Sequence, residues 1–319
     1  MNSKCLFCFV MILSLFSFVF MAHGQEKIKI IFDTDIAGDI DDAFAHGLVQ
    51  VSDEFEVLGI TIADGPTRER AIVSCRMLYE CNQEHIPVAF GRPTRQGSGL
   101  APQLIWGEGF DKYKPVKESA ADFIIRNLRK YPGEITIISV GPVTNLGDVI
   151  DKDPEAWKMV KAVYSMFGSF YMGYDEGPIP SAEWNVRADV KSSQKFMTSG
   201  VPIVLAGLDV TTMVKFREER RLQLLFRRSP LTDAICSLYS LWSADSPGRH
   251  PTLFDPVAVA MVINPRVVGT RDAYVRVTDE GYTVIEESRE PNCKIGMSVN
   301  VEGVLDFVTE RLLKQNLMR

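Results

Sequence analysis

The sequence has little of what marks several common classes of protein. It has only 6 cysteines among 319 residues, which excludes a small fold held together by disulfides. It has no long basic run and a net charge of −6, so nucleic acid is not expected as a partner. We find no internal repeat and no linker rich in serine, glycine and proline. With 46% hydrophobic residues, the chain can bury the core of a single folded domain.

The first 24 residues differ from the rest and are interpreted as a secretory signal peptide. Lys4 precedes an apolar run at 5–21, and the small-residue segment Ala22-His23-Gly24 follows. This order predicts cleavage near Gly24, which leaves one domain at 25–319. An uncleaved N-terminal anchor is the alternative, because the apolar run is close to the length that spans a bilayer. We expect an exported protein, periplasmic or extracellular, without stable membrane insertion after cleavage.

Four cysteines remain in that domain, namely Cys75, Cys81, Cys236 and Cys293. Their spacing fits no CxxC or Cys/His metal motif. An oxidising compartment permits disulfides, but Cys75 and Cys81 would point to different sides of the helix predicted around them. We therefore expect buried, reduced cysteines.

Short apolar segments alternate with helical patterns through most of the domain. Strands are expected at 28–32, 57–62, 88–90, 135–140, 163–167 and 201–206, and helices at 41–51, 67–81, 120–130, 143–150 and 190–199. This alternation predicts a single α/β domain with a mostly parallel central sheet flanked by helices. The C-terminal part is expected to add helices at 218–242 and 256–262, a small hairpin at 273–286 and a closing helix at 303–313.

An acidic loop follows the first predicted strand. Its sequence, DTDIAGDIDD, contains five aspartates: Asp33, Asp35, Asp39, Asp41 and Asp42. In open parallel sheets, ligands bind beyond the carboxyl ends of the strands. Carboxylates this close repel one another unless a cation or a helix N-terminus offsets their charge, so a hard divalent cation is the simplest explanation. Helix capping alone would explain one or two of the five.

Two alternative metal loops fit the spacing less well. An EF-hand loop that starts at Asp33 would place Phe44 at its twelfth position, where a bidentate glutamate is required, so this alternative fails. Haloacid-dehalogenase-like phosphatases also begin with DxD after their first strand. That family usually has threonine or valine where Ala37 stands, and it does not account for the pair Asp41-Asp42.

The acidic loop resembles that of the inosine-uridine preferring nucleoside hydrolase family, whose motif is DxDPGxDD. The shared features are a strand ending in DTD, a glycine, and an Asp-Asp pair at a helix start. The present loop is two residues longer and has Ile36 where proline is common. Further resemblance follows in the family's order, at VGPVTN (from Val140), MFG (from Met166), EWN (from Glu183), Asp189, GLDVT (from Gly207) and FDP (from Phe254). The resemblance therefore extends over nearly all of the domain.

The resemblance implies calcium-dependent hydrolysis of the N-glycosidic bond of a ribonucleoside or related N-riboside, giving ribose and free base. It implies that Ca²⁺ is bound by Asp35, Asp42, Asp255 and the backbone carbonyl of Val140. Asp35 would also be the catalytic base that takes a proton from the attacking water. The implied substrate-binding residues are Asp41, Asp64, Met166, Glu183, Asn185 and Phe254.

Three departures from the family fall on the part of the site expected to hold the base and the 5′ end. Phe254 stands where many members have a histidine that protonates the leaving base, and phenylalanine has no proton to give. Asp64 and Gly177 each replace an asparagine. The base that is accepted is therefore left open, and the candidate proton donors are His250, Tyr174 and Trp242.

A second function remains open, that of a calcium-dependent, non-catalytic binder of a ribosyl or cis-diol ligand. Such a protein would need no catalytic base, so the presence of Asp35 favours the enzyme. The expected partner is a small nucleoside or N-riboside. Because dimers and tetramers are common in the family, the resemblance also allows a homo-oligomer.

Overall fold

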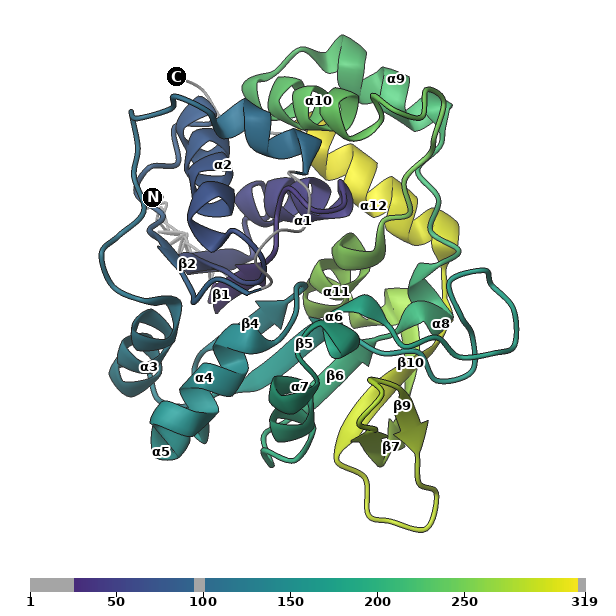
Figure 1. The fold of residues 1–319 in the computed structure, drawn as a ribbon. Coiled ribbons are helices and arrows are strands. Elements are labelled where there is room, and N and C mark those ends of the chain that lie inside the picture. The colour runs from purple at the N-terminus through teal and green to yellow at the C-terminus, as the bar shows by residue number, and fades with distance from the viewer. Residues whose placement is uncertain (1–25, 95–100, 315–319) are drawn as a thin grey trace, which may run out of the picture.

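The computed structural model describes residues 26–94 and 101–314, so the predicted signal peptide lies outside the described residues. A central sheet of eight strands has the order β3-β2-β1-β4-β5-β6-β10-β7 (Figure 1). Its strands are β1 (Ile28–Thr34), β2 (Phe55–Ile62), β3 (Val88–Phe90), β4 (Thr136–Ser139), β5 (Ala162–Met166), β6 (Ile203–Ala206), β7 (Val268–Ala273) and β10 (Cys293–Val299). Neighbouring strands pair in parallel, except that β10 and β7 are antiparallel. The predicted mostly parallel sheet is confirmed.

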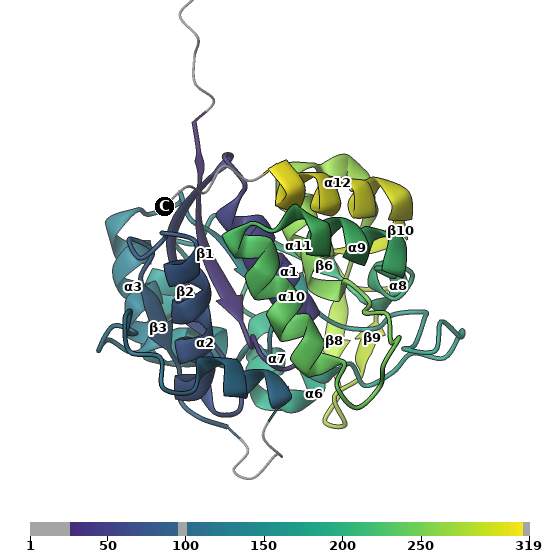
Figure 2. The ribbon, with the colours of Figure 1, turned by 90° about the horizontal axis from the view of Figure 1, so that it is seen from above.

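Helices cover both faces of the sheet, and β1 is buried between them. Ile30 and Phe32 belong to one hydrophobic core, whereas Ile31 belongs to the other, because successive side chains of a strand point to opposite faces. The first core is closed by α1 (Asp41–Gln50), α2 (Thr67–Glu80), α10 (Pro230–Trp242), α11 (Phe254–Ile263) and α12 (Val301–Lys314). Figure 2 looks down on this side of the molecule. The second core is closed by α3 (Ala120–Lys130), α4 (Thr144–Lys152) and α7 (Val190–Met197).

The order of the strands reverses beside β1. This strand pairs with β2 on one side and with β4 on the other. Such a switch point leaves a crevice outside the carboxyl ends of the strands, where ligands of α/β proteins bind. Loop 35–40 follows β1 and Val140 follows β4, so the fold brings both predicted parts of the site to this crevice.

The single helix predicted at 218–242 is wrong, because two helices lie there. α9 (Glu218–Arg227) is followed by Arg228, which adopts the left-handed conformation with φ +50°. Ser229 then caps α10, and Pro230 is its first residue. Proline cannot continue a helix because it lacks a backbone N–H and clashes with the preceding turn. Ser229 followed by Pro230 is a signal for a helix start, and the prediction of one helix did not take it into account.

Strands β7 and β10 were missed by the sequence analysis. β7 forms the edge of the sheet, and only its end residues Val268 and Ala273 are buried, so it lacks an apolar run. The hairpin of β8 (Val275–Val277) and β9 (Thr283–Ile285) and the closing helix α12 are confirmed. Short elements complete the described chain: α5 (Pro154–Trp157), α6 (Trp184–Ala188), α8 (Leu208–Thr211) and two 3₁₀ turns, η1 (Pro102–Gly107) and η2 (Pro265–Val267).

The four cysteines of the domain are free in the structure. Cys75, Cys81 and Cys293 are buried, and Cys236 is half-buried. Burial raises the pKa of the Cys75 and Cys293 thiols to about 12.

Among the residues that the structure describes, no helix has the length and apolar character needed to cross a membrane.

His46 is expected to make the stability of the fold depend on pH. Its ring nitrogens lie 2.9 Å from Ser74 Oγ and 2.9 Å from Gln50 Nε2, and burial lowers its pKa from 6.5 to about 3. The unfolded chain takes up a proton below pH 6.5 that the folded chain takes up only near pH 3. The contribution of His46 is therefore complete above pH 6.5 and is lost as the pH falls towards 3, by about 2 kcal/mol between pH 6.5 and 5.

We expect the free energy of unfolding of His46→Gln to decrease much less than that of wild type when the pH is lowered. Urea unfolding at pH 7 and pH 5 measures it, and the exposed His85 supplies the control variant His85→Gln. The same decrease between the two pH values in wild type and His46→Gln would contradict the assignment.

Candidate active site

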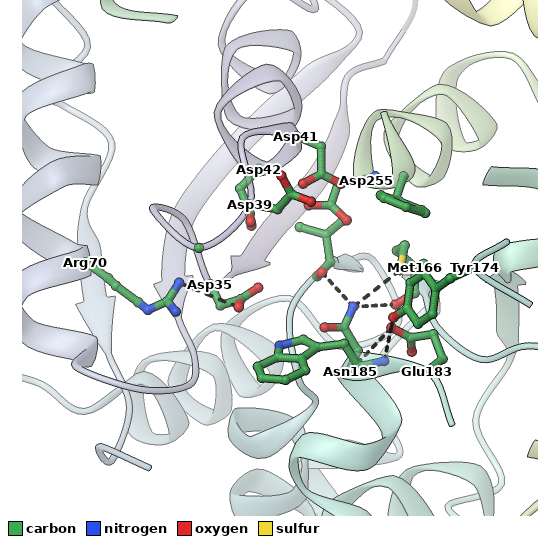
Figure 3. Close-up of a pocket in the computed structure, with 14 residues that line it drawn as sticks. Asp35, Asp39, Asp41, Asp42, Arg70, Met166, Tyr174, Glu183, Asn185 and Asp255 are labelled. Carbon is green, nitrogen blue, oxygen red and sulfur yellow. Dashed lines mark hydrogen bonds and ion pairs between the residues drawn. The ribbon is translucent and has the colours of Figure 1, made fainter. Parts of the chain in front are cut away.

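A cavity of about 280 Å³ opens at the crevice beside β1 and β4 (Figure 3). Six of the described residues that line it are carboxylic acids, namely Asp35, Asp39, Asp41, Asp42, Glu183 and Asp255, and one is a cation, Arg70. The others are Gly38, Val140, Met166, Tyr174, Trp184, Asn185 and Phe254. The cavity is therefore strongly acidic, and its size is at the lower end of the range for small-molecule sites.

Three buried carboxylates form a cluster at the meeting point of two helices. Asp41 and Asp42 begin α1, and Asp255 lies in the first turn of α11. One carboxylate oxygen from each lies within 4.8 Å of the other two. The backbone N–H of Asp255 donates to Asp41 Oδ2 at 3.2 Å, and the hydroxyl of Thr34 donates to Asp42 Oδ1. The helix packing thus fixes three oxygen ligands at one point.

Burial raises the pKa of Asp41, Asp42 and Asp255 well above the ordinary value, and the neighbouring carboxylates raise it further. A divalent cation would reverse this effect, because its charge stabilises the ionised form of each ligand. Hard cations prefer carboxylate and carbonyl oxygens over other protein ligands. The donor set therefore fits a metal site of this kind.

Asp35 lines the same cavity but lies outside this cluster of three. Its Oδ2 is 3.6 Å from Nη1 of Arg70, and the same Nη1 donates to the carbonyl oxygen of Ile36 at 2.9 Å. Figure 3 shows Arg70 and Asp35 joined by this contact. The loop turns sharply after Asp35 and Ile36, since Ala37 has a φ of +72°. Arg70 was not predicted, because an arginine inside a helix carries no motif.

Glu183 is held by four hydrogen bonds at the N-terminus of α6. It accepts from the backbone N–H groups of Asn185 (2.8 Å), Gly168 (3.1 Å) and Val186 (3.3 Å), and from the hydroxyl of Tyr174 (3.3 Å). Burial raises the pKa of Glu183 to about 7, although these hydrogen bonds lower it. The carboxylate is thereby fixed in direction at the cavity wall.

The predicted ligand Val140 is tied to two other predicted residues. The side-chain amide of Asn185 donates to the carbonyl oxygen of Val140 at 2.9 Å and to that of Met166 at 3.0 Å. These contacts join α6 to the ends of β4 and β5. All three residues line the cavity, on the wall that also carries Glu183.

Asp64 and Phe254 occupy different positions relative to the cavity. Asp64 is buried, its Oδ1 accepts from the hydroxyl of Thr94 at 2.5 Å, and it is not among the described residues that line the cavity. Phe254 does line the cavity, where its ring meets the ring of Tyr174 edge-on at 6.1 Å.

Of the three candidate proton donors, Tyr174 lies in the cavity. Its hydroxyl donates to Glu183, and burial raises its pKa. Trp242 lies close enough to Asp39, which lines the cavity, to lower the pKa of its carboxyl against the larger effect of burial. His250 is exposed and is not one of the described lining residues.

Asp33 lies behind the cavity and holds the surrounding strands together. It accepts hydrogen bonds from Thr61 (2.6 Å), Asn145 (2.7 Å) and Ser139 (3.4 Å). Burial raises its pKa to about 7. These contacts connect the end of β1 to β2, β4 and α4, so Asp33 supports the acidic loop from behind.

The fold and the cavity define an α/β protein with an acidic site suited to a hard cation and a small polar ligand. Residues 30–306 match the inosine-uridine preferring nucleoside hydrolase family, and the chain belongs to this family. It is accordingly an enzyme that hydrolyses the N-glycosidic bond of ribonucleosides.

Similar proteins match the chain over most of its length. It is 28% identical to uridine nucleosidase 1 of Arabidopsis thaliana, over 90% of this chain and 93% of that protein. It is 26% identical to the pyrimidine-specific ribonucleoside hydrolase RihA of Citrobacter koseri, over 89% and 98%. A solved plant nucleoside hydrolase has a TM-score of 0.80 at 24% identity, over 90% and 99%. The solved purine-preferring ribonucleoside hydrolase from Gardnerella vaginalis has a TM-score of 0.76 at 23% identity, over 89% and 98%. The two solved structures show that the fold is shared.

Proposed function

We propose that the chain is an exported, calcium-dependent nucleoside hydrolase that cleaves a ribonucleoside or related N-riboside into ribose and free base. The observation that carries this proposal is the buried cluster of Asp41, Asp42 and Asp255, which shares one cavity with Glu183 and Asn185. Family membership supports the reaction, and the all-oxygen donor set supports calcium. The signal-like segment at 1–24 supports export.

The proposed calcium ligands are Asp42, Asp255, the carbonyl of Val140 and Asp35 from the neighbouring loop. Calcium, when bound, supplies a fixed positive charge that orients the ribose hydroxyls and lowers the pKa of water. Asp41 is proposed to bind a ribose hydroxyl from within the cluster. Three further residues, Glu183, Asn185 and Met166, hold the rest of the ribose.

Cleavage of the bond between C1′ and the base nitrogen passes through a transition state with positive charge on the ribose. Water attacks C1′ while the bond to the base breaks, and Asp35 takes the proton from that water. In their ionised form, which a bound cation favours, the carboxylates that line the cavity stabilise the positive charge of the sugar. The leaving base carries away the bonding electrons. It departs easily if it takes up a proton, if a cation neutralises it, or if it is stable as an anion.

The experiment that tests this function is product analysis with a panel of nucleosides. Relatives carry names that refer to uridine, to pyrimidines and to purines, so the panel contains uridine, cytidine, inosine and adenosine. We expect equal amounts of ribose and free base from at least one of them. Tight binding without any product would favour the non-catalytic binder of a ribosyl or cis-diol ligand.

Because Phe254 cannot donate a proton, we expect substrates with good leaving groups to be strongly favoured. p-Nitrophenyl riboside should be cleaved at least about 10²-fold faster than inosine or uridine, since a general acid typically contributes 10²–10⁴-fold. Phe254→His should accelerate inosine cleavage and leave p-nitrophenyl riboside unchanged, with Phe254→Leu as the matched control. Equal rates for natural and activated substrates, with a pH profile that shows one essential acid, would instead indicate another donor.

A further inference from the structure

Arg70 is a buried cation in a cavity that otherwise holds acids. It lies in the first turn of α2, its side chain is 9% exposed, and no other described residue lining the cavity is basic. Burying a charged side chain is costly unless partners repay the loss of water. The partners of Arg70 therefore indicate what its charge is for.

Those partners are two consecutive residues of the acidic loop. Nη1 donates to the carbonyl oxygen of Ile36 at 2.9 Å and lies 3.6 Å from Oδ2 of Asp35. The charge also acts on Asp42, whose pKa it lowers against the larger effect of burial. One guanidinium thus holds the backbone of the loop and faces the carboxylate that the loop carries.

The Nε of Arg70 gives a second indication. This atom is buried and has no hydrogen-bond partner in the described part of the chain. An unpaired buried donor costs free energy, so contacts of the other guanidinium atoms must offset this cost. The position of Arg70 is therefore better explained by what its other atoms hold.

Two glycines provide the space that the guanidinium occupies. A Cβ atom at Gly38 would lie 3.2 Å from Nη1, and one at Gly65 would lie 3.4 Å from Nε. Gly65 also has a φ of +61°, a conformation that side chains disfavour. The loop after β1 and the turn after β2 thus close around Arg70 from two sides.

We propose that Arg70 is a positioning residue that fixes the direction of the Asp35 carboxylate within the active site. This inference rests on the proposed role of Asp35 as the base. Asp35 follows directly on a strand, in a loop with a left-handed turn at Ala37, and the nearby acids repel it. The guanidinium opposes this repulsion and restricts the carboxylate to one orientation. A displacement of about 1 Å in a catalytic group can cost about 10²-fold in rate.

The test compares Arg70→Met with Arg68→Met, a control at an exposed arginine of the same helix. We expect Arg70→Met to lower kcat by about 10- to 10²-fold and to change KM by less than about threefold. Its calcium dissociation constant, measured by calorimetry, should stay close to that of wild type, because the removal of a neighbouring positive charge opposes the effect of a less well oriented Asp35. An unchanged kcat, or a loss confined to KM or to calcium binding, would overturn the proposal.

A double-mutant cycle shows whether Arg70 acts through Asp35. In the Asp35→Asn background, Arg70→Met should lower kcat by less than about threefold further, because the carboxylate it positions is already gone. Multiplicative losses would mean that Arg70 acts independently of Asp35 and would overturn the proposal.

Arg70→Lys keeps the charge and serves if Arg70→Met does not fold. A lysine is a point charge without the fork of arginine, so it cannot hold Ile36 and Asp35 in the same geometry. We expect its kcat to lie several-fold below that of wild type, and above that of Arg70→Met where that variant folds. KM should be unchanged. A kcat equal to that of wild type would overturn the two-point contact.

A wild-type protein that binds calcium but cleaves no riboside would contradict the proposed function, whereas an active wild type with unaffected Arg70 variants would contradict only this inference.

Discussion

Asp42→Ala is expected to abolish calcium binding. The carboxylate of Asp42 is buried, it belongs to the cluster with Asp41 and Asp255, and Thr34 fixes its direction. The carbonyl of Val140 cannot replace it, because a carbonyl carries no net charge. Removing a group that only supports a metal ligand commonly costs 10- to 100-fold in affinity, so loss of the ligand itself should exceed about 10²-fold.

Calcium in the purified protein and the calcium-dependent rise in Tm both measure this effect. Binding to the folded state raises Tm, so the rise should disappear in Asp42→Ala. Asp39→Ala is the matched control, since Asp39 lies in the loop directly before α1 and lines the cavity outside the cluster of three. We expect it to weaken calcium binding by less than about tenfold. An unchanged calcium content in Asp42→Ala would contradict the assignment of the site.

Asp35→Asn is expected to fold normally and to lower kcat by at least about 10²-fold, the lower end of the range for loss of a general base. The amide has nearly the same shape as the carboxylate, and its oxygen can still face Arg70. It cannot accept a proton from water. The assay uses saturating calcium, so that weaker metal binding does not determine the result. The exposed Asp53 supplies the control variant Asp53→Asn. Full activity of Asp35→Asn would mean that another group activates the water.

The sheet could be predicted because its central strands are buried on both faces. β1 and its parallel neighbours read as short apolar runs, and helical patterns separate them along the chain. The edge strand β7 could not be predicted in this way, because most of its residues are not buried. The break between α9 and α10 depends on the left-handed Arg228, which no apolar pattern reveals.

The acidic part of the site could be predicted because Asp41 and Asp42 open the helix that follows the loop after the first strand. Asp255 is more than 200 positions away in sequence, so only its resemblance to a family motif connected it with them. The contact of Tyr174 with Glu183 depends on the path of the intervening loop. The contact of Arg70 with Asp35 depends on where the first turn of α2 meets that loop. Neither arrangement has a pattern in the sequence.

The most direct test of the central claim is a measurement of nucleoside hydrolysis through one cycle of calcium removal and return. The same protein sample is assayed for ribose and free base before chelation, after chelation and after calcium is added back, with its metal content measured at each stage. We expect hydrolysis to fall by at least about 10²-fold when calcium is removed, because the ion proposed to orient the ribose and to lower the pKa of the attacking water is lost, and to recover when calcium returns. Undiminished hydrolysis by protein shown to be free of metal, or nucleosides recovered intact from calcium-loaded protein, would contradict the claim.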